Sequence, residues 1–333
     1  MKIESLVRIT GGVLLNTPSV NSIDNIKINS KKIERGDLFI DVNNSNEDIY
    51  EAIDNGAYCI LTATIPKIED EEIAWVSVQD LTTTLIKLSR FYATNKNFKF
   101  VTLSFLQYEL AKCLQIDKNA KVLSQEPQHA LLEILKAKEN ELFFVVDNAF
   151  INKVDPTILI PEETSEAQHV FEHSIFYSSF VLHEKFINNI KLSSLFIPHL
   201  CALVKYLEKL NINFTIDNFN HFGHFYPQFV NNKLEKKDFG STRKALIFEK
   251  NFKLFKKEIE YLEEKVDNNA LIIFVPKEKV NNLTCKAVKM VYNNFSDIQN
   301  LQNIDFRYVL IYGKIDNFEE FLESHSNKQM TLF

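Results

Sequence analysis

Two histidines four residues apart are the first candidates for chemistry in this sequence. His169 and His173 are flanked by Glu166 and Glu172. Imidazole and carboxylate groups are common zinc ligands, so the histidine pair with one of these glutamates could form one edge of a metal site. A pair of histidines is not a complete site, and no later histidine-rich segment is aimed at it. The alternative is a surface turn that carries two titratable rings.

A second candidate is the segment after the apolar run at residues 98–103, where a phosphate-binding loop would open a helix. Such a site needs free backbone N–H groups at close range, a lysine for the phosphate oxygens and a hydroxyl for Mg²⁺. Here Phe105, Leu106 and Tyr108 fill that space, and Lys112 comes two turns later, where a solvent-exposed helix face accounts for it. No glycine occurs between Ala57 and Phe222. We therefore expect no tight binding or hydrolysis of ATP.

The composition is that of an ordinary globular protein of two or three domains, with 333 residues, 45% apolar and 25% charged. A net charge of -6 argues against direct binding to nucleic acid or to an anionic membrane. The start carries no apolar signal core, and no apolar run approaches the roughly 18 residues of a membrane span, so we expect a cytoplasmic protein. Four isolated cysteines, Cys59, Cys113, Cys201 and Cys285, indicate reduced thiols.

The first 97 residues predict a small mixed sheet with two helices. Gly36 marks a turn into a buried strand at residues 37–40, and Gly56 closes a short helix. Strands are predicted at residues 58–62 and 74–78, and Asp80 is placed to cap a helix that reaches residue 92.

This order of elements resembles the N-terminal domain of the Mur ligase family, ATP-dependent enzymes that add amino acids to the UDP-linked peptidoglycan precursor. The family pattern is a Ser-Arg pair, Gly-Asp-Leu-Phe, an Ala…Gly-Ala helix end and a Val-x-Asp strand end. It falls on Ser30 and Lys31, residues 36–39, 52–57 and 78–80, with Lys31 in place of Arg. The resemblance implies that Ser30 and Lys31 hold the UDP-sugar end of a UDP-N-acetylmuramoyl peptide. The loop after residue 40 is shorter than in the family, and the alternative is that Ser30 only bonds the backbone of a turn.

Residues 98–240 continue with alternating strands and helices, and resemble a degenerate central P-loop-type domain of the family. Strands are predicted at residues 121–123, 142–147, 157–161, 174–186 and 187–195, and helices at 129–138 and 197–210. Asp147 stands where family members have a magnesium-binding Glu, so it could bind a metal; the alternative is an aspartate that caps a turn. The family's Gly-x-x-Gly-Lys-Thr loop and the lysine that holds a second magnesium have no counterpart.

Residues 241–326 resemble the Rossmann-like C-terminal domain, shortened in its middle. Strands at residues 245–248, 270–275 and 307–314 alternate with helices at 251–265 and 316–323. Gly223 and His224 stand where the family has Gly-Arg. The predicted fold is therefore α/β, with a three-domain Mur-ligase-like architecture.

The missing elements favour a catalytically inactive protein, a pseudoenzyme of bacterial peptidoglycan synthesis in the cell wall pathway. It would bind the precursor or a protein partner, such as a cell-wall enzyme, and no cofactor is expected. The competing interpretation is a diverged ATP-dependent ligase with a rebuilt site, which would need ATP and Mg²⁺.

The last seven residues, 327–333, are predicted to form a mobile tail after a helix that ends near Glu323. Gln329, Met330, Leu332 and Phe333 resemble the short peptide by which bacterial proteins dock on the replication sliding clamp. In such peptides two adjacent apolar side chains fill a pocket and the glutamine fixes the register. The alternative is that Leu332 and Phe333 fold back on the sheet of the third domain.

Overall fold

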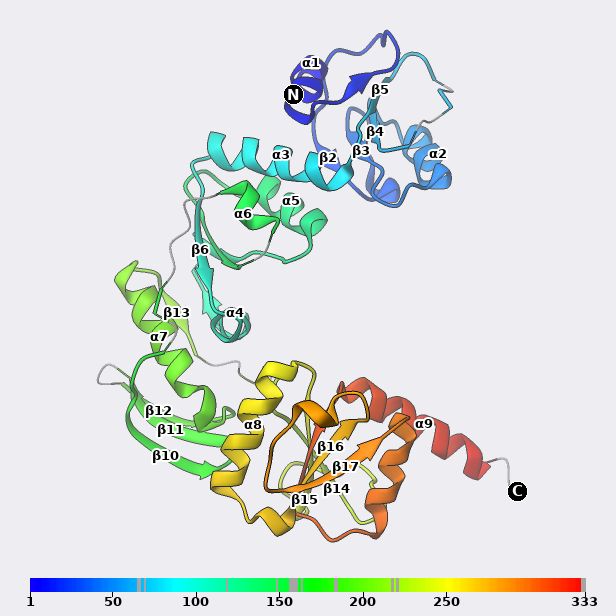
Figure 1. Cartoon of the computed structure of the whole chain (residues 1–333). Coiled ribbons are helices and arrows are strands. Elements are labelled where there is room, and N and C mark those ends of the chain that lie inside the picture. The colour runs from blue at the N-terminus through cyan, green and yellow to red at the C-terminus, as the bar shows by residue number, and fades with distance from the viewer. Residues whose placement is uncertain are drawn as a thin grey trace. The chain divides into compact units, whose positions relative to one another are not determined.

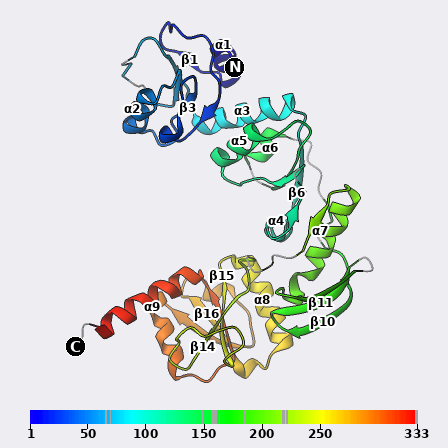
Figure 2. The ribbon, with the colours of Figure 1, turned by 180° about the vertical axis from the view of Figure 1, so that it is seen from behind.

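The computed structural model describes residues 1–64, 67–68, 70–117, 119–147, 149–155, 161–162, 164–182, 185–216, 219 and 222–330. The chain divides into two compact units. The first contains Met1–Glu163 and Ala202–Thr215, and the second contains Thr164–Cys201 and Ile216–Phe333. Both units are α/β, as predicted (Figures 1 and 2). The domain boundaries predicted near residues 97, 240 and 326 stay predictions.

The first unit opens with a five-stranded sheet in the order β1-β5-β4-β3-β2. Its strands are β1 Val13–Leu14, β2 Ile26–Lys27, β3 Leu38–Ile40, β4 Cys59–Thr62 and β5 Ala74–Ser77. Strands β2 to β5 are parallel, and only β1 is antiparallel to its neighbour. Apolar side chains fill both faces, which is the pattern of a parallel sheet covered on two sides.

Helices α1 (Ile3–Thr10), α2 (Asn46–Asp54) and α3 (Leu81–Asn95) flank this sheet. One face packs with α2 around Phe39, Ile60 and Trp75, whereas the other joins a larger core that includes α1 and α3. The predicted N-cap of α3 is confirmed, because the Asp80 carboxylate accepts a 2.6 Å hydrogen bond from the backbone N–H of Thr83.

A second, three-stranded parallel sheet shares this larger core, in the order β6-β9-β8. Its strands are β6 Lys99–Leu103, β8 Ala120–Val122 and β9 Leu142–Val146, and its helices are α4 Phe105–Ala111, α5 Pro127–Lys136 and α6 Ile151–Val154. Helix α5 packs on α3, so the two sheets of the first unit are held by one apolar interior. A short antiparallel pair, β7 Gln115–Ile116 with β13 Phe214–Thr215, completes the unit. The predicted strand at residues 157–161 falls mostly outside the described residues.

The second unit contains a three-stranded antiparallel sheet of β10 Gln168–Ser174, β11 Tyr177–Leu182 and β12 Lys185–Ile190. The two strands predicted at residues 174–186 and 187–195 are therefore wrong in their boundaries. The first of them covers the turn at Ile175 and Phe176 and residues of β10, β11 and β12. An apolar run gives no signal for such a turn when it lacks glycine and proline. The predicted helix is confirmed as α7, Ile197–Lys209, which follows a 3₁₀ helix η2 at Ser194–Phe196.

The main sheet of the second unit has the order β14-β15-β18-β16-β17. Its strands are β14 Tyr226–Val230, β15 Lys244–Glu249, β16 Leu271–Pro276, β17 Val288–Tyr292 and β18 Tyr308–Tyr312, all parallel except β14. Helix α8 (Phe252–Lys265) covers one face, and α9 (Ile315–Met330) lies with η6 (Phe295–Asn303) on the other (Figures 1 and 2). Short 3₁₀ helices, η4 Asn268–Ala270 and η5 Val280–Asn282, flank β16. Strand β17 and η6 were not predicted.

The end of helix α9 corrects one prediction. The helix continues to Met330 and does not end near Glu323. Residues 324–328 are polar but contain neither glycine nor proline, so nothing in them stops a solvent-exposed helix. Gln329 and Met330 thus lie in the helix, whereas Leu332 and Phe333 lie outside the described residues.

Candidate functional site

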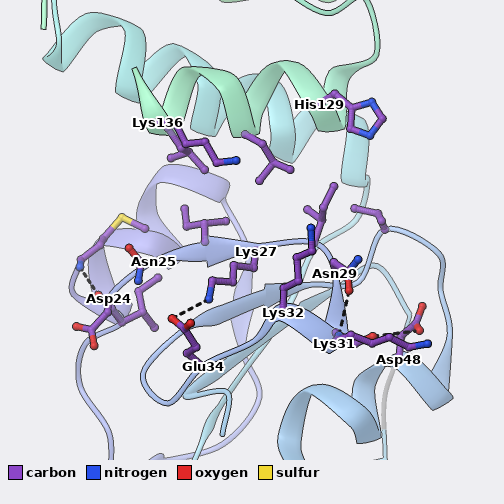
Figure 3. Close-up of a pocket in the computed structure, with 18 of the residues that line it drawn as sticks. Asp24, Asn25, Lys27, Asn29, Lys31, Lys32, Glu34, Asp48, His129 and Lys136 are labelled. Atoms are coloured by element: carbon purple, nitrogen blue, oxygen red, sulfur yellow. Dashed lines mark hydrogen bonds and ion pairs between the residues drawn. The ribbon is translucent and has the colours of Figure 1, made fainter. Parts of the chain in front are cut away.

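A large open pocket in the first unit lies beside strand β2 and the 3₁₀ helix η1, Ser30–Lys32. Its volume is about 1260 Å³. One wall is residues 24–34, and the opposite wall is helix α5, which contributes His129 and Lys136. Figure 3 shows Lys32 extending from the first wall toward α5, with Lys136 on the helix above it. A pocket of this size can enclose a nucleotide-sized ligand.

The first wall takes its shape from a glycine turn. Gly36 has φ +100°, and a Cβ at this position would overlap the carboxylate of Asp24, which lines the pocket. Only glycine adopts this backbone conformation without strain and leaves that space open. The carbonyl of Gly36 accepts a 2.8 Å hydrogen bond from the N–H of Asp24, which fixes the chain as it enters β2.

Ser30 is buried at the base of the pocket and links η1 to helix α2. Its hydroxyl donates a 2.6 Å hydrogen bond to the Glu51 carboxylate, and its carbonyl accepts one of 3.0 Å from the Asn55 side chain. Asn29 caps the same short helix by accepting from the N–H of Lys31 at 3.0 Å. Because the hydroxyl proton already has a partner, Ser30 can offer a ligand only an acceptor lone pair. Its structural contribution is to hold Lys31 and Lys32 at the pocket wall.

The pocket lining contains one lysine whose charge is neutralised by acidic side chains and three lysines whose charges are available to a ligand. Lys27 contacts Asp37 at 2.7 Å and Glu34 at 3.1 Å, and the hydrogen bond to Asp37 raises the pKa of Lys27. Burial acts to raise the pKa of the Asp37 carboxyl, but hydrogen bonds, chiefly from Lys27, outweigh burial and lower it. Lys31, Lys32 and Lys136 are exposed and form no ion pair within the part of the chain that the structure describes. These lysines are therefore available to an anionic ligand.

The start of helix α4, where a phosphate loop would lie, is closed by its own side chains. The Ser104 hydroxyl accepts from the N–H of Gln107 at 3.4 Å, and the Gln107 side chain accepts from the N–H of Ser104 at 3.1 Å. This capping box occupies N–H groups that a phosphate would need. The buried Gln107 amide also donates to the carbonyl of Glu162 at 2.7 Å, and Tyr108 donates to the carbonyl of Leu123 at 2.7 Å. The helix start is thus packed.

Lys112, two turns beyond this start, points to solvent as predicted. Its ammonium group contacts Glu109 at 2.7 Å and lies 4.5 Å from the ring centroid of Tyr108. A lysine held in these contacts on the outside of the helix does not face the space that nucleotide phosphates would occupy.

Asp147 lies at the same sheet edge as Ser104, because β6 and β9 are parallel neighbours and Leu103 pairs with Val146. Its exposed carboxylate accepts a 2.7 Å hydrogen bond from the Asn152 side chain, five residues on. An aspartate that stabilises a turn makes this kind of hydrogen bond to a residue a few positions along the chain. Within the described ranges, no group of three or more metal-ligating side chains gathers around it or elsewhere.

The histidine pair lies on strand β10, which was predicted as neither strand nor helix. His173 contacts the Ser179 hydroxyl at 2.6 Å, and Glu172 pairs with Lys265 at 2.7 Å. Within the described ranges these residues belong to no group of three or more metal-ligating side chains, and a metal edge at His169 and His173 stays a prediction.

A buried cluster in the second unit was missed by the sequence analysis. His224 Nδ1 lies 2.9 Å from the carboxylate of Glu249, and both side chains are buried. Glu258, on α8, is fully buried, and desolvation together with the negative charge of Glu249 raises its pKa well above the ordinary value. In the sequence, Glu258 lies between Phe255 and Leu262 on the apolar face of α8. An acidic residue on an apolar helix face is the one sequence signal that could have revealed this cluster. His224, which stands where the family has an arginine, therefore faces an internal partner.

Comparisons with known proteins place the fold. No protein-family model matches the sequence, and no curated protein matches it. A crystal structure of MurF from Acinetobacter baumannii matches with a TM-score of 0.60 and 11% identity, covering 97% of this chain and 98% of that one. MurF ligase from Thermotoga maritima in complex with ADP matches with a TM-score of 0.58 and 15% identity, covering 92% and 98%. The chain thus has the Mur ligase fold.

Among the described residues, no helix is long and apolar enough to cross a membrane.

Proposed function

We propose that this protein is a catalytically inactive, Mur-ligase-like protein of peptidoglycan synthesis that binds a UDP-N-acetylmuramoyl peptide without ATP. The proposal rests on a contrast between two places in the first unit, the pocket beside Ser30 and the start of α4. The pocket beside Ser30 keeps exposed lysines available to a ligand, whereas the start of α4 is capped by its own side chains. The fold supports the ligand class, since one of the matching structures is a ligase whose name contains the UDP-N-acetylmuramoyl group.

The pocket suits the diphosphate of such a ligand. Lys32 and Lys136 approach from opposite walls, and Lys31 adds a third cation on the same side as Lys32 (Figure 3). Charge-assisted hydrogen bonds from lysine to phosphate are among the stronger polar contacts. The chain as a whole carries a net charge of -6, so this local group of cations is what draws an anion to the pocket.

The side chains at the start of α4 support the proposed absence of ATP binding. A nucleotide triphosphate requires several free N–H groups and a lysine on its β- and γ-phosphates. The capping box uses N–H groups of Ser104 and Gln107, and Lys112 lies outside. Without a bound triphosphate and its magnesium ion, the carboxylate of a precursor has no route to an acyl phosphate.

Isothermal titration calorimetry on the full chain tests the proposal. The wild-type protein should bind a UDP-N-acetylmuramoyl peptide, and Lys32→Gln with Lys136→Gln should weaken binding by about tenfold or more, since each charge-assisted contact contributes about 1.5–3 kcal/mol. A matched control, Arg8→Gln with Lys99→Gln, removes the same charge away from the pocket and should bind like the wild type. Titration of the wild-type protein with MgATP should give no heat of binding. Magnesium-dependent ATP binding at micromolar affinity, or no precursor binding at about 1 mM, would overturn the proposal.

A further inference from the structure

An open pocket in the second unit gathers cations at the edge of the main sheet where the parallel strands begin. Its volume is about 990 Å³, and Arg243, Lys244 and Arg307 are among the residues that line it. Lys244 is the first residue of β15, and Arg307 directly precedes β18. Asn251 and Gly313 follow β15 and β18 and lie at the carboxyl ends of these strands. Ligands of open α/β sheets usually bind at the carboxyl ends, so this pocket is separate from that region.

The sheet register places the cations side by side. Ala245 pairs with Tyr308, so the residues just before them, Lys244 and Arg307, are neighbours at the sheet edge. The backbone of Arg307 is fixed on both sides, because its carbonyl accepts from the N–H of Ala245 at 3.0 Å and its N–H donates to the carbonyl of Ala270 at 2.9 Å. Arg243 is one residue further along the same chain segment. The ladder thus makes Lys244 and Arg307 neighbours, and Arg243 lines the same pocket.

The lysine and the arginines differ in how their charges are used. The Lys244 ammonium donates to the carbonyl of Ile304 at 2.9 Å and lies 4.5 Å from the ring centroid of Phe306, which anchors it. The Arg307 guanidinium lies 5.2 Å from the ring of Tyr308. Neither Arg243 nor Arg307 forms an ion pair with any side chain in the described ranges. Both arginines are exposed.

The acidic groups of the pocket do not cancel these arginines. Asp267 lines the pocket, but its carboxylate accepts a 2.9 Å hydrogen bond from the N–H of Asn269 and so caps η4. Asp305 is the other acid in the lining. The three cations exceed the two acids, and the lining adds the neutral donors Asn232 and Thr242. Planar guanidinium groups match phosphate and carboxylate groups, which accept several hydrogen bonds at once.

We infer that this pocket is an oxyanion-binding site, in which Arg243 and Arg307 hold a small ligand bearing a phosphate group or a pair of carboxylates. It is independent of the precursor pocket in the first unit and of the question of catalysis. The proposal rests on two exposed arginines, Arg243 and Arg307, that line one pocket.

Calorimetric titrations of the full chain with pyrophosphate and with citrate provide the test. Wild type should bind at least one of them, and the identity of that probe assigns the ligand to the phosphate or the carboxylate class. Arg243→Gln with Arg307→Gln should weaken binding by about tenfold or more. Lys253→Gln with Lys286→Gln, a control that removes the same charge from the same unit, should leave it within about twofold.

Two results would overturn the inference. One is no heat with either probe up to about 10 mM, the range of weak anion binding. The other is equal binding by the arginine variant and the control. Circular dichroism of both variants establishes that each is folded, and titration of the precursor into the arginine variant should be unchanged, because its pocket lies in the other unit.

Discussion

Replacing Glu258 by Gln should remove a pH dependence of stability that the wild-type protein carries. The Glu258 side chain is fully buried on α8, where its carboxyl group lies near the carboxylate of Glu249. Burial, and then the charge of Glu249, raise the pKa of Glu258 well above its ordinary value. The folded protein therefore keeps this proton to a higher pH than the unfolded chain does.

The sign and size of the effect follow from linkage. In the unfolded chain the carboxyl loses its proton near pH 4.3, whereas the folded protein releases it only at the raised pKa. The contribution of Glu258 is fully present below the unfolded pKa, and it declines as the pH rises toward the folded pKa. Within that window the free energy of unfolding should fall by about 1.4 kcal/mol per pH unit. Glu258→Gln has no proton to lose and should lack this slope.

Urea unfolding followed by far-ultraviolet circular dichroism, between about pH 5 and pH 8, measures the difference. Glu260→Gln, an exposed neighbour on the same helix, is the control and should follow the wild type. The reasoning is refuted if the wild-type and Glu258→Gln stability curves stay parallel across this range.

Other predictions concern the cap of α3, the buried thiols and the C-terminal residues. Asp80→Ala should lower the free energy of unfolding by about 1 kcal/mol, because the N–H of Thr83 loses its acceptor; an unchanged urea midpoint would contradict this. Burial raises the pKa of Cys113 and of Cys201 to about 11, so neither should react with iodoacetamide in the folded protein near pH 7.5, and mass spectrometry after labelling would reveal it if they did. A labelled peptide of residues 327–333 should bind the host's sliding clamp in fluorescence polarisation and lose binding when both Leu332 and Phe333 are replaced by Ala; no binding at about 100 μM would exclude docking.

Local signals in the sequence predicted much of the fold. Gly36 marked the turn into β3, Asp80 marked the start of α3, and the apolar face around Phe255 predicted α8. Each of these signals acts within one turn of chain, so neighbouring residues suffice to detect it. The strands β10 to β12 and the length of α9 were not predictable in this way, since no glycine or proline marks their ends.

The candidate sites depended more on contacts between distant residues. Ser30 and Lys31 were predicted from a motif, and the structure places both in the lining of one pocket, but the Glu51 partner of Ser30 comes from a helix about 20 residues on. The pairing of His224 with Glu249 joins residues on separate elements, and a single sequence carries no signal for it. Lys136 on α5 likewise reaches the pocket only through the packing of α5 on α3.

The central claim is that the precursor binds beside η1 while the start of α4 remains closed. A titration of ¹⁵N-labelled protein with a UDP-N-acetylmuramoyl peptide, in the presence of MgATP, measures both parts in one spectrum. The account predicts that backbone amides of residues 25–32 shift with added peptide and that amides of residues 104–108 stay in place. A spectrum in which no amide near Ser30 moves, or in which those at the start of α4 do, would contradict it.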